Sequence, residues 1–221
     1  MLKIITTADG SHSLFNEELN ETYHSVHGAI QESLHVFIKS GLQYVLEKSS
    51  PLPISIFEVG FGTGLNALLT LQYMRGHPKA VNYTAIEHSP LGEEIWSKLN
   101  YASLLNLGAE YKGLHYSEWG RPHDLTSNFN FLKLNNSLQQ VELSNESLDL
   151  VYYDAFAPSK QPELWSTDVL GKFFEALKPG GVLVTYCAKG QLKRDLNALG
   201  LVVETLPGPP GKKEMVRAVK P

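Results

Sequence analysis

Strand-like apolar runs alternate with segments of helix length from about residue 54 to the end of the chain. This alternation predicts a parallel sheet whose strands are joined by crossover helices. Seven strands are expected, at residues 54–58, 82–87, 131–134, 148–153, 181–186, 201–206 and 214–219. Four helices are expected, at residues 64–75, 90–104, 162–177 and 190–199, with boundaries marked by Pro51, Pro53, Pro90, Pro162 and Pro179.

The last two strands need a different kind of connection. The segment Pro207-Gly208-Pro209-Pro210-Gly211 between them is too short for a crossover helix, so the final strand should enter the sheet antiparallel. The pattern therefore predicts an α/β fold of the Rossmann-like class I methyltransferase type. Its seven-stranded, mostly parallel sheet with an antiparallel last strand differs from the ordinary dinucleotide-binding arrangement.

An N-terminal segment of about 50 residues comes before the first of these strands. Apolar residues recur near its end at three- and four-residue spacings, which predicts a helix; they are Ile30, Leu34, Phe37, Ile38, Leu42 and Val45. We expect residues 1–50 to form an N-terminal extension that packs on the core as a lid or a wall, and residues 51–221 to form the methyltransferase domain. Residues 108–130 are polar and aromatic without a clear period and are expected to be an insertion.

The composition fits one compact domain and indicates where in the cell the protein is located. The chain has 221 residues, of which 43% are hydrophobic, enough to bury a sizeable core. Its beginning lacks the apolar stretch of a signal peptide, and no run is long enough to span a membrane. Cys187 is the single cysteine, which excludes an internal disulfide and a cysteine-rich zinc site. We therefore expect a cytoplasmic protein.

Charge is unevenly distributed along the chain. The net charge is −4, but the segment from Lys178 onward carries eight basic and three acidic residues, leaving the rest of the chain at −9. A basic segment on an acidic body can steer a polyanion to one face, although an ordinary solvated surface has the same pattern. The candidate phosphate contacts in this segment are Lys189, Lys193, Arg194, Lys212 and Lys213.

A glycine-rich turn follows the first predicted strand. Gly60, Gly62 and Gly64 allow a sharp turn and a close approach of backbone to a cofactor at the start of a helix. The spacing G-x-G-x-G differs from the dinucleotide fingerprint G-x-G-x-x-G, in which the helix faces a pyrophosphate. Glu58 would repel a pyrophosphate but can hold a water or the cationic methionine end of S-adenosylmethionine.

Two further polar positions lie at the ends of neighbouring strands. Glu87 ends the second predicted strand, where a carboxylate can accept hydrogen bonds from both ribose hydroxyls of a cofactor. Asn135 and Asn136 follow the third strand, where an adenine amino group can be recognised, although loop asparagines are also common turn formers. Together with the glycine turn, Glu87 favours S-adenosylmethionine over a dinucleotide.

The fourth predicted strand ends in Asp154-Ala155-Phe156-Ala157-Pro158. Methyl transfer is an in-line displacement, so an enzyme mainly aligns the acceptor and excludes water. Asp154 can orient an amine acceptor and help its proton leave, while Phe156 can stack on a planar substrate. Both are candidate catalytic residues, although a strand-end aspartate can also simply bond to backbone. His24, His27 and His35 lack a completing ligand cluster, so no metal is expected.

Several longer segments carry a family resemblance. They are Asp9-Gly10-Ser11 with Leu14, Tyr23-His24-Ser25, Gly28-Ala29 with Glu32-Ser33 and His35-Val36-Phe37, Glu58 to Asn66, Asp154 to Pro158 with Lys160, Pro162 to Trp165, Thr185 to Gly190, and Pro207 to Met215. On these segments, which span nearly all of the sequence, the chain resembles the bacterial MnmC-like methyltransferases that act on the modified wobble uridine of tRNA.

The resemblance implies methylation of the exocyclic amine of 5-aminomethyl-2-thiouridine, with S-adenosylmethionine as donor. It implies that Asp154 lies in the active site beside the cofactor and that Asn66 is among the cofactor-binding residues. Longer family members add a flavin-dependent oxidase domain, and this sequence stops at Pro221, so no flavin chemistry is implied. The family usually has an acid where this chain has Asn136.

Two alternatives remain open at the level of sequence. One is a methyltransferase whose acceptor is a small amine metabolite instead of tRNA. The other is a noncatalytic module of the same fold that binds RNA or a protein partner through the basic segment. Charge reversal at Lys193 and Lys212 separates the first alternative from a tRNA enzyme, and Asp154→Ala separates the second.

Overall fold

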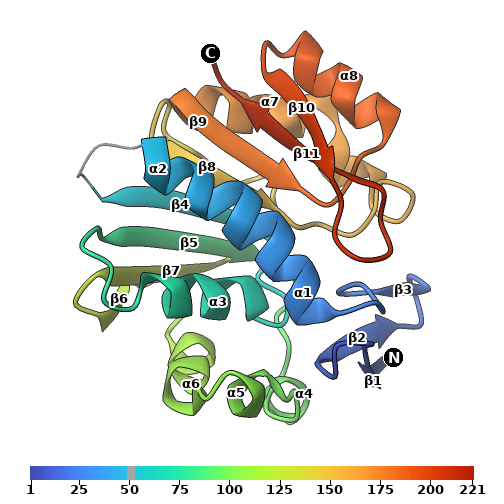
Figure 1. Cartoon of the computed structure of the whole chain (residues 1–221), viewed down its shortest axis with the longest axis vertical. Helices are drawn as coiled ribbons and strands as arrows, with labels where there is room; N and C mark the ends of the chain where they lie inside the picture. Colours follow the sequence, from blue (N-terminus) through green and yellow to red (C-terminus); the bar gives the residue numbers. More distant parts are fainter. Residues whose placement is uncertain (49–52) are drawn as a thin grey trace.

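A twisted sheet of eight strands forms the centre of the protein (Figure 1). The computed structural model describes residues 1–48 and 53–221. The strand order is β10-β11-β9-β8-β4-β5-β7-β6. The strands are β4 (Ile54–Val59), β5 (Val81–Glu87), β6 (His123–Thr126), β7 (Phe129–Asn135), β8 (Leu148–Tyr153), β9 (Leu177–Thr185), β10 (Val202–Pro207) and β11 (Glu214–Val219).

The strand directions confirm the predicted fold class. Strands β4, β5, β7, β8 and β9 pair in parallel, whereas β11 is antiparallel to both β9 and β10. All seven predicted strands are present with small shifts at their ends. The eighth, β6, pairs antiparallel with β7 at the sheet edge and lies in the segment predicted to be an insertion.

The helices between the strands are more broken than predicted. They are α3 (Leu65–Met74), α4 (Glu93–Trp96), α5 (Tyr101–Leu104), α6 (Gly108–Tyr116), the 3-10 turn η2 (Pro162–Trp165), α7 (Thr167–Ala176) and α8 (Gly190–Ala198). The helix predicted at 90–104 is split into α4 and α5. Asn100, between them, accepts a hydrogen bond from the His12 backbone and donates one to the Gly10 carbonyl. The helix predicted at 162–177 is interrupted at Ser166, whose hydroxyl caps α7. No helix in the described part of the chain is long and apolar enough to cross a membrane.

The N-terminal segment forms a small sheet followed by a long helix. The sheet consists of β1 (Leu2–Thr6), β2 (His12–Asn16) and β3 (Glu21–Thr22). The helix runs through α1 (Ala29–Ser33), the π-helical η1 (Leu34–Gln43) and α2 (Tyr44–Lys48), and it crosses one face of the main sheet beside α3 (Figure 1). Pro51 and the expected boundary between residues 50 and 51 lie outside the described residues.

The apolar stripe predicted on this helix does face the sheet. Phe37 and Leu42 are buried, and the Phe37 ring lies 5.1 Å from that of Tyr152 in β8. Gly41 brings the helix close to β9, since a β-carbon there would lie 2.9 Å from Val184 Cγ2. Leu34 is the exception, with 41% of its surface exposed. The helix is therefore part of the core on this side of the sheet.

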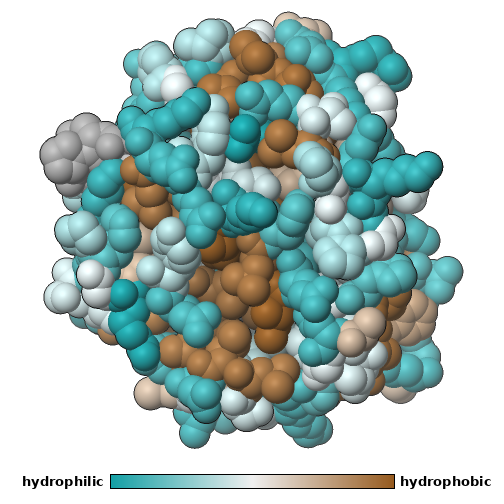
Figure 2. Space-filling view, in the orientation of Figure 1, coloured by the Kyte–Doolittle hydropathy of each residue, from teal (hydrophilic) through white to brown (hydrophobic). Residues whose placement is uncertain are grey.

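The two faces of the sheet carry separate apolar clusters. One cluster joins the N-terminal helix, α3 and α6 to the sheet, and the other joins α7 and α8 to its opposite face. Neighbouring residues of β4 divide between them, with Ile56 in the first cluster and Phe57 in the second, as side chains alternate along a strand. Figure 2 shows an apolar area near the centre of the first face, surrounded by polar side chains.

Removing the buried ring at position 37 should destabilise the whole fold. We expect Phe37→Ala to lower the free energy of unfolding by about 3–5 kcal/mol, because it leaves a cavity between helix and sheet. Leu34→Ala, on the exposed side of the same helix, should cost less than about 1 kcal/mol. Urea denaturation measures both, and equal small losses would show that the helix is not part of the core.

Candidate active site

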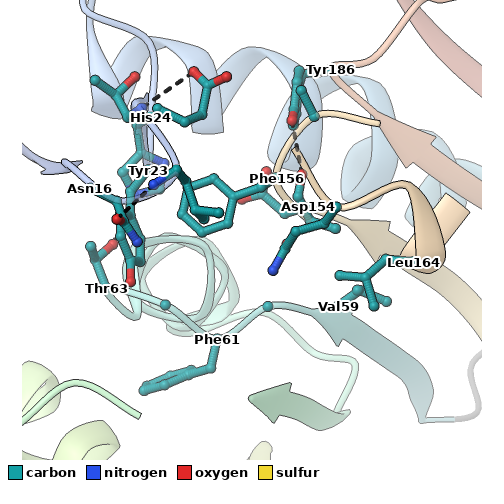
Figure 3. Close-up of a pocket in the computed structure, with 18 of the residues that line it drawn as sticks. Asn16, Tyr23, His24, Val59, Phe61, Thr63, Asp154, Phe156, Leu164 and Tyr186 are labelled. Atoms are coloured by element: carbon teal, nitrogen blue, oxygen red, sulfur yellow. Dashed lines mark hydrogen bonds between the residues drawn. The ribbon is translucent and has the colours of Figure 1, made fainter. Parts of the chain in front are cut away.

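A cavity of about 690 Å³ opens at the carboxyl ends of the parallel strands. Its walls come from the turns after β4 and β8, the ends of β5 and β9, the loop after β7, and the loop between β10 and β11. The N-terminal segment from Phe15 to Val26 supplies a further wall. Figure 3 shows residues of the N-terminal segment facing those of the sheet edge across this cavity.

The glycine turn forms the part of the wall between β4 and α3. Gly60, Gly62 and Gly64 all have positive φ angles, of 87°, 49° and 76°. At Gly60 a side chain is also excluded by space, since a β-carbon would lie 3.0 Å from the Asp154 carbonyl oxygen. The turn therefore exposes backbone to the cavity, and α3 begins directly after it at Leu65.

Glu58 lies behind this turn and does not line the cavity. The side chain is fully buried, next to the side chains of Tyr83 and Asn66. Burial, and then the charge of Asp154, raise the pKa of Glu58 well above its ordinary value. Asn66 of α3 does line the cavity; its amide nitrogen donates to Asp154 Oδ2 (2.8 Å), and its buried Oδ1 has no partner among the described residues.

Glu87 lies at the end of β5, across the turn from Asn66. Its two oxygens accept hydrogen bonds from the backbone nitrogens of Gly62 (3.0 Å) and Ser89 (2.8 Å). Each oxygen can accept a further hydrogen bond, and Glu87 lines the cavity, so two ribose hydroxyls can be bound there. Asn136 is exposed on the cavity wall, and its Oδ1 accepts the Ser137 backbone N–H (2.8 Å) in the manner of a turn-forming asparagine.

Asp154 occupies the wall directly after β8. Its carboxylate accepts the Asn66 hydrogen bond, and its backbone nitrogen donates to the Val59 carbonyl (3.1 Å). Burial and the charge of Glu32 raise the pKa of Asp154 to about 7, while the Asn66 hydrogen bond and the charge of Lys212 oppose that rise. A carboxyl group with this pKa can both hold and release a proton near neutral pH.

Aromatic rings line the cavity near this carboxylate. Phe156 and Tyr23 meet edge to face with their centroids 5.0 Å apart (Figure 3). The Tyr186 hydroxyl donates to the Ala155 carbonyl (2.8 Å), which places that ring on the same side. Burial, and then the charge of Glu87, raise the pKa of Tyr23 to about 12, so its hydroxyl stays neutral. These rings can enclose a planar group beside Asp154.

Of the five basic residues predicted to bind phosphate, only Lys212 lines the cavity. Lys189 and Lys213 are exposed on the surface. The Lys193 ammonium pairs with Glu214 (2.7 Å), and Arg194 donates to Gln191 (2.7 Å). The predicted cofactor and catalytic residues therefore meet at one cavity, except Glu58 and Gly64, which do not line it. The basic residues are divided between the cavity and the surface.

Sequence reasoning gave no role to several residues of the N-terminal wall. His24 Nε2 and Thr63 Oγ1 form a hydrogen bond of 2.8 Å, so His24 holds the glycine turn from the opposite side. Burial lowers the pKa of His24 to about 4, which keeps its ring neutral at neutral pH. Tyr23 and His24 belong to the segments that carried the family resemblance, but a single sequence cannot show that they face the turn at Thr63.

The site fits S-adenosylmethionine on several counts. Asn66 presents a buried acceptor atom without a protein partner among the described residues, the backbone of Gly60 and Gly62 lines the cavity, and Glu87 has free acceptor capacity. A family model described as S-adenosyl-L-methionine-dependent methyltransferase matches residues 115–221. Together with the sheet order, these observations define the class: the chain is an S-adenosylmethionine-dependent methyltransferase.

Within that class the chain is related to the MnmC proteins. It is 30% identical over 216 residues to the tRNA 5-methylaminomethyl-2-thiouridine biosynthesis bifunctional protein MnmC of Cupriavidus necator, covering 92% of this chain and 32% of that protein. The protein of the same name from Leptospira interrogans is 30% identical over 217 residues, covering 91% and 33%. The chain thus spans about a third of the length of these relatives. The crystal structure of MNMC2 from Aquifex aeolicus superposes with a TM-score of 0.76 at 27% identity, covering 100% of this chain and 72% of that one.

Loss of the Glu87 carboxylate should weaken cofactor binding. We expect Glu87→Ala to raise the dissociation constant for S-adenosylmethionine by about 100-fold, the equivalent of two lost hydrogen bonds to a charged acceptor. Isothermal titration calorimetry measures it. Glu94→Ala, an exposed acid outside the cavity wall, is the matched control and should bind like the parent. Unchanged affinity in Glu87→Ala would rule out a ribose contact at this position.

Proposed function

We propose that this chain transfers a methyl group from S-adenosylmethionine to the exocyclic amine of 5-aminomethyl-2-thiouridine at the wobble position of tRNA. The observation that carries the proposal is the Asp154 carboxylate, with its pKa near 7, in a cavity wall beside Tyr23 and Phe156. The names of the related MnmC proteins support the choice of acceptor.

Each part of the cofactor is assigned to a group of residues. The backbone of Gly60 and Gly62 lies against it, Gly64 completes the turn behind them, and Glu87 binds its ribose. Asn136 binds the adenine, either through its amide nitrogen or after its turn hydrogen bond opens. Asn66 receives the positively charged methionine end, and Glu58, buried behind the turn, is assigned to this end only indirectly, through its contact with Asn66.

The reaction needs an amine in its neutral form. The cofactor supplies a methyl group on a positively charged sulfur. The nitrogen lone pair forms the new bond to carbon while the carbon–sulfur bond breaks and sulfur keeps its electron pair. Asp154, ionised, orients the amine and accepts the proton that nitrogen must lose, and then returns it to water. Phe156 packs against the uracil ring and, with Tyr23, excludes water from the methyl group.

The remaining assignments concern the residues that contact tRNA phosphates and the division of the chain into an extension and a domain. Exposed Lys189 and Lys213, with Arg194, are assigned to phosphates; Lys193 contributes less because it pairs with Glu214. Residues 1–50 are assigned as the N-terminal extension that supplies one wall of the cavity, and residues 51–221 as the methyltransferase domain. A tRNA substrate also favours a location in the cytoplasm.

The acceptor is tested with radiolabelled cofactor and tRNA. Undermodified tRNA that carries the aminomethyl group should gain label on the wobble uridine, and fully modified tRNA should not. Charge reversal at Lys189 and Lys213 should raise KM for tRNA several-fold and leave the cofactor affinity unchanged. Label in a free small amine but not in tRNA would instead identify a small-amine methyltransferase.

The role of Asp154 gives the reaction a characteristic pH dependence. Because Asp154 must be ionised, with a pKa of about 7, and the acceptor amine must be neutral, two ionisations limit kcat/KM. Its logarithm should therefore rise with a slope of about two per pH unit below pH 7 and of about one above it, up to the pKa of the amine. Asp154→Asn should lower turnover by about 100-fold or more, abolish this inflection and leave cofactor affinity nearly unchanged. Full activity of Asp154→Asn would contradict the role and favour a noncatalytic or differently catalysed function.

A further inference from the structure

A partly buried ion pair lies in the cavity wall and joins two distant parts of the chain. Lys212 Nζ, in the loop between β10 and β11, lies 2.6 Å from Glu32 Oε1 of α1. The Glu32 side chain is only 7% exposed, and that of Lys212 is 33% exposed. The other Glu32 oxygen accepts the Ser25 backbone N–H (2.7 Å), so both of its oxygens are bonded.

The lysine of this pair also touches the aromatic wall. Its ammonium lies 3.8 Å from the centroid of the Tyr186 ring, a cation–π contact. Tyr186 in turn donates to the Ala155 carbonyl, next to Asp154. Glu32, Lys212, Tyr186 and Asp154 all line the same cavity. The pair therefore connects the N-terminal segment, the loop after β10 and the end of β9 around the carboxylate.

Burial of the Glu32 charge has a cost that packing alone does not explain. Removing a carboxylate from water is expensive, and an apolar side chain of similar size often stabilises a fold equally well. A paired charge in the cavity wall that also holds Asp154 points to an electrostatic role. The two charges act on Asp154 in opposite directions, since Glu32 raises its pKa and Lys212 lowers it.

On this basis, and resting on the proposed function, we propose that Glu32 and Lys212 are positioning residues that set the ionisation of Asp154 and hold Tyr186 against the acceptor base. Lys212 keeps the carboxylate able to accept a proton. Glu32 fixes the place of Lys212 and limits how far its charge depresses the basicity of Asp154. Lys212 is thereby assigned to the active site and not to the phosphate-binding surface.

Other groups also face Asp154 and must stay constant in any test. Glu58 of β4 and Tyr83 of β5 interact with its charge from behind, and Tyr186 does so from the end of β9. Asn66 donates a hydrogen bond to it from α3. All four residues are kept in the Glu32 and Lys212 variants, but Tyr186 loses the contact of its ring with the Lys212 ammonium in Lys212→Met.

The test measures the ionisation of Asp154 in full-length protein with cofactor bound. The carboxyl carbon is followed by NMR with isotopically labelled aspartate and is assigned with Asp154→Asn. We expect Lys212→Met to raise the pKa of Asp154, because a positive charge is lost, and Glu32→Gln to lower it, because a negative charge is lost. The double variant should fall between the two. Lys212→Arg should behave like the parent, as should Lys39→Met, an exposed lysine of η1 outside the cavity wall.

The same variants are then compared in tRNA methylation. The acidic limb of the kcat/KM profile should move to higher pH in Lys212→Met and to lower pH in Glu32→Gln. Rates on that limb should change about tenfold for each pH unit by which it moves. Movement of the Asp154 pKa in the same direction in both variants, or in neither, would overturn the proposal. If the parent protein methylates no tRNA, the proposed function fails, but the NMR titration still decides the role of the pair.

Discussion

The close approach of the turns after β4 and β8 is the constraint on which the site depends. The Asp154 nitrogen donates to the Val59 carbonyl, and the Asp154 carbonyl lies where a β-carbon of residue 60 would be 3.0 Å away. Only a glycine at position 60 permits this packing with its positive φ angle. One backbone contact therefore fixes the cofactor-binding turn and the reactive carboxylate relative to each other.

Around this contact, burial and nearby charges keep the Asp154 carboxyl group able to exchange a proton near neutral pH. Burial raises the pKa of both Glu58 and Asp154. The charge of Asp154 also raises the pKa of Glu58, and both charges raise that of Tyr83. Asn66 donates to Asp154 and holds its orientation. From the N-terminal wall, His24 forms a hydrogen bond with Thr63 in the glycine turn, and Glu32 pairs with Lys212. The segment before β4 therefore contributes to the site as well as to the core.

The sequence predicted seven of the eight strands because each buried parallel strand is a short apolar run and the Pro-Gly loop before β11 is too short for a crossover helix. It missed β6, a polar edge strand of four residues. It was less informative about helices, since the break at Asn100 depends on bonds to Gly10 and His12, some 90 positions away. Glycine spacing and strand ends located Glu87 and Asp154. The pairing of Glu32 with Lys212, 180 positions apart, leaves no periodic or spacing signal in one sequence.

The central claim is that the cavity between the glycine turn and Asp154 is where the methyl group is transferred. A crystal structure with S-adenosylhomocysteine tests it most directly. We expect the ribose hydroxyls to bond to Glu87 and the sulfur to face the space between Asp154 and Phe156. A cofactor product bound elsewhere, or one whose sulfur faces away from Asp154, would contradict the claim.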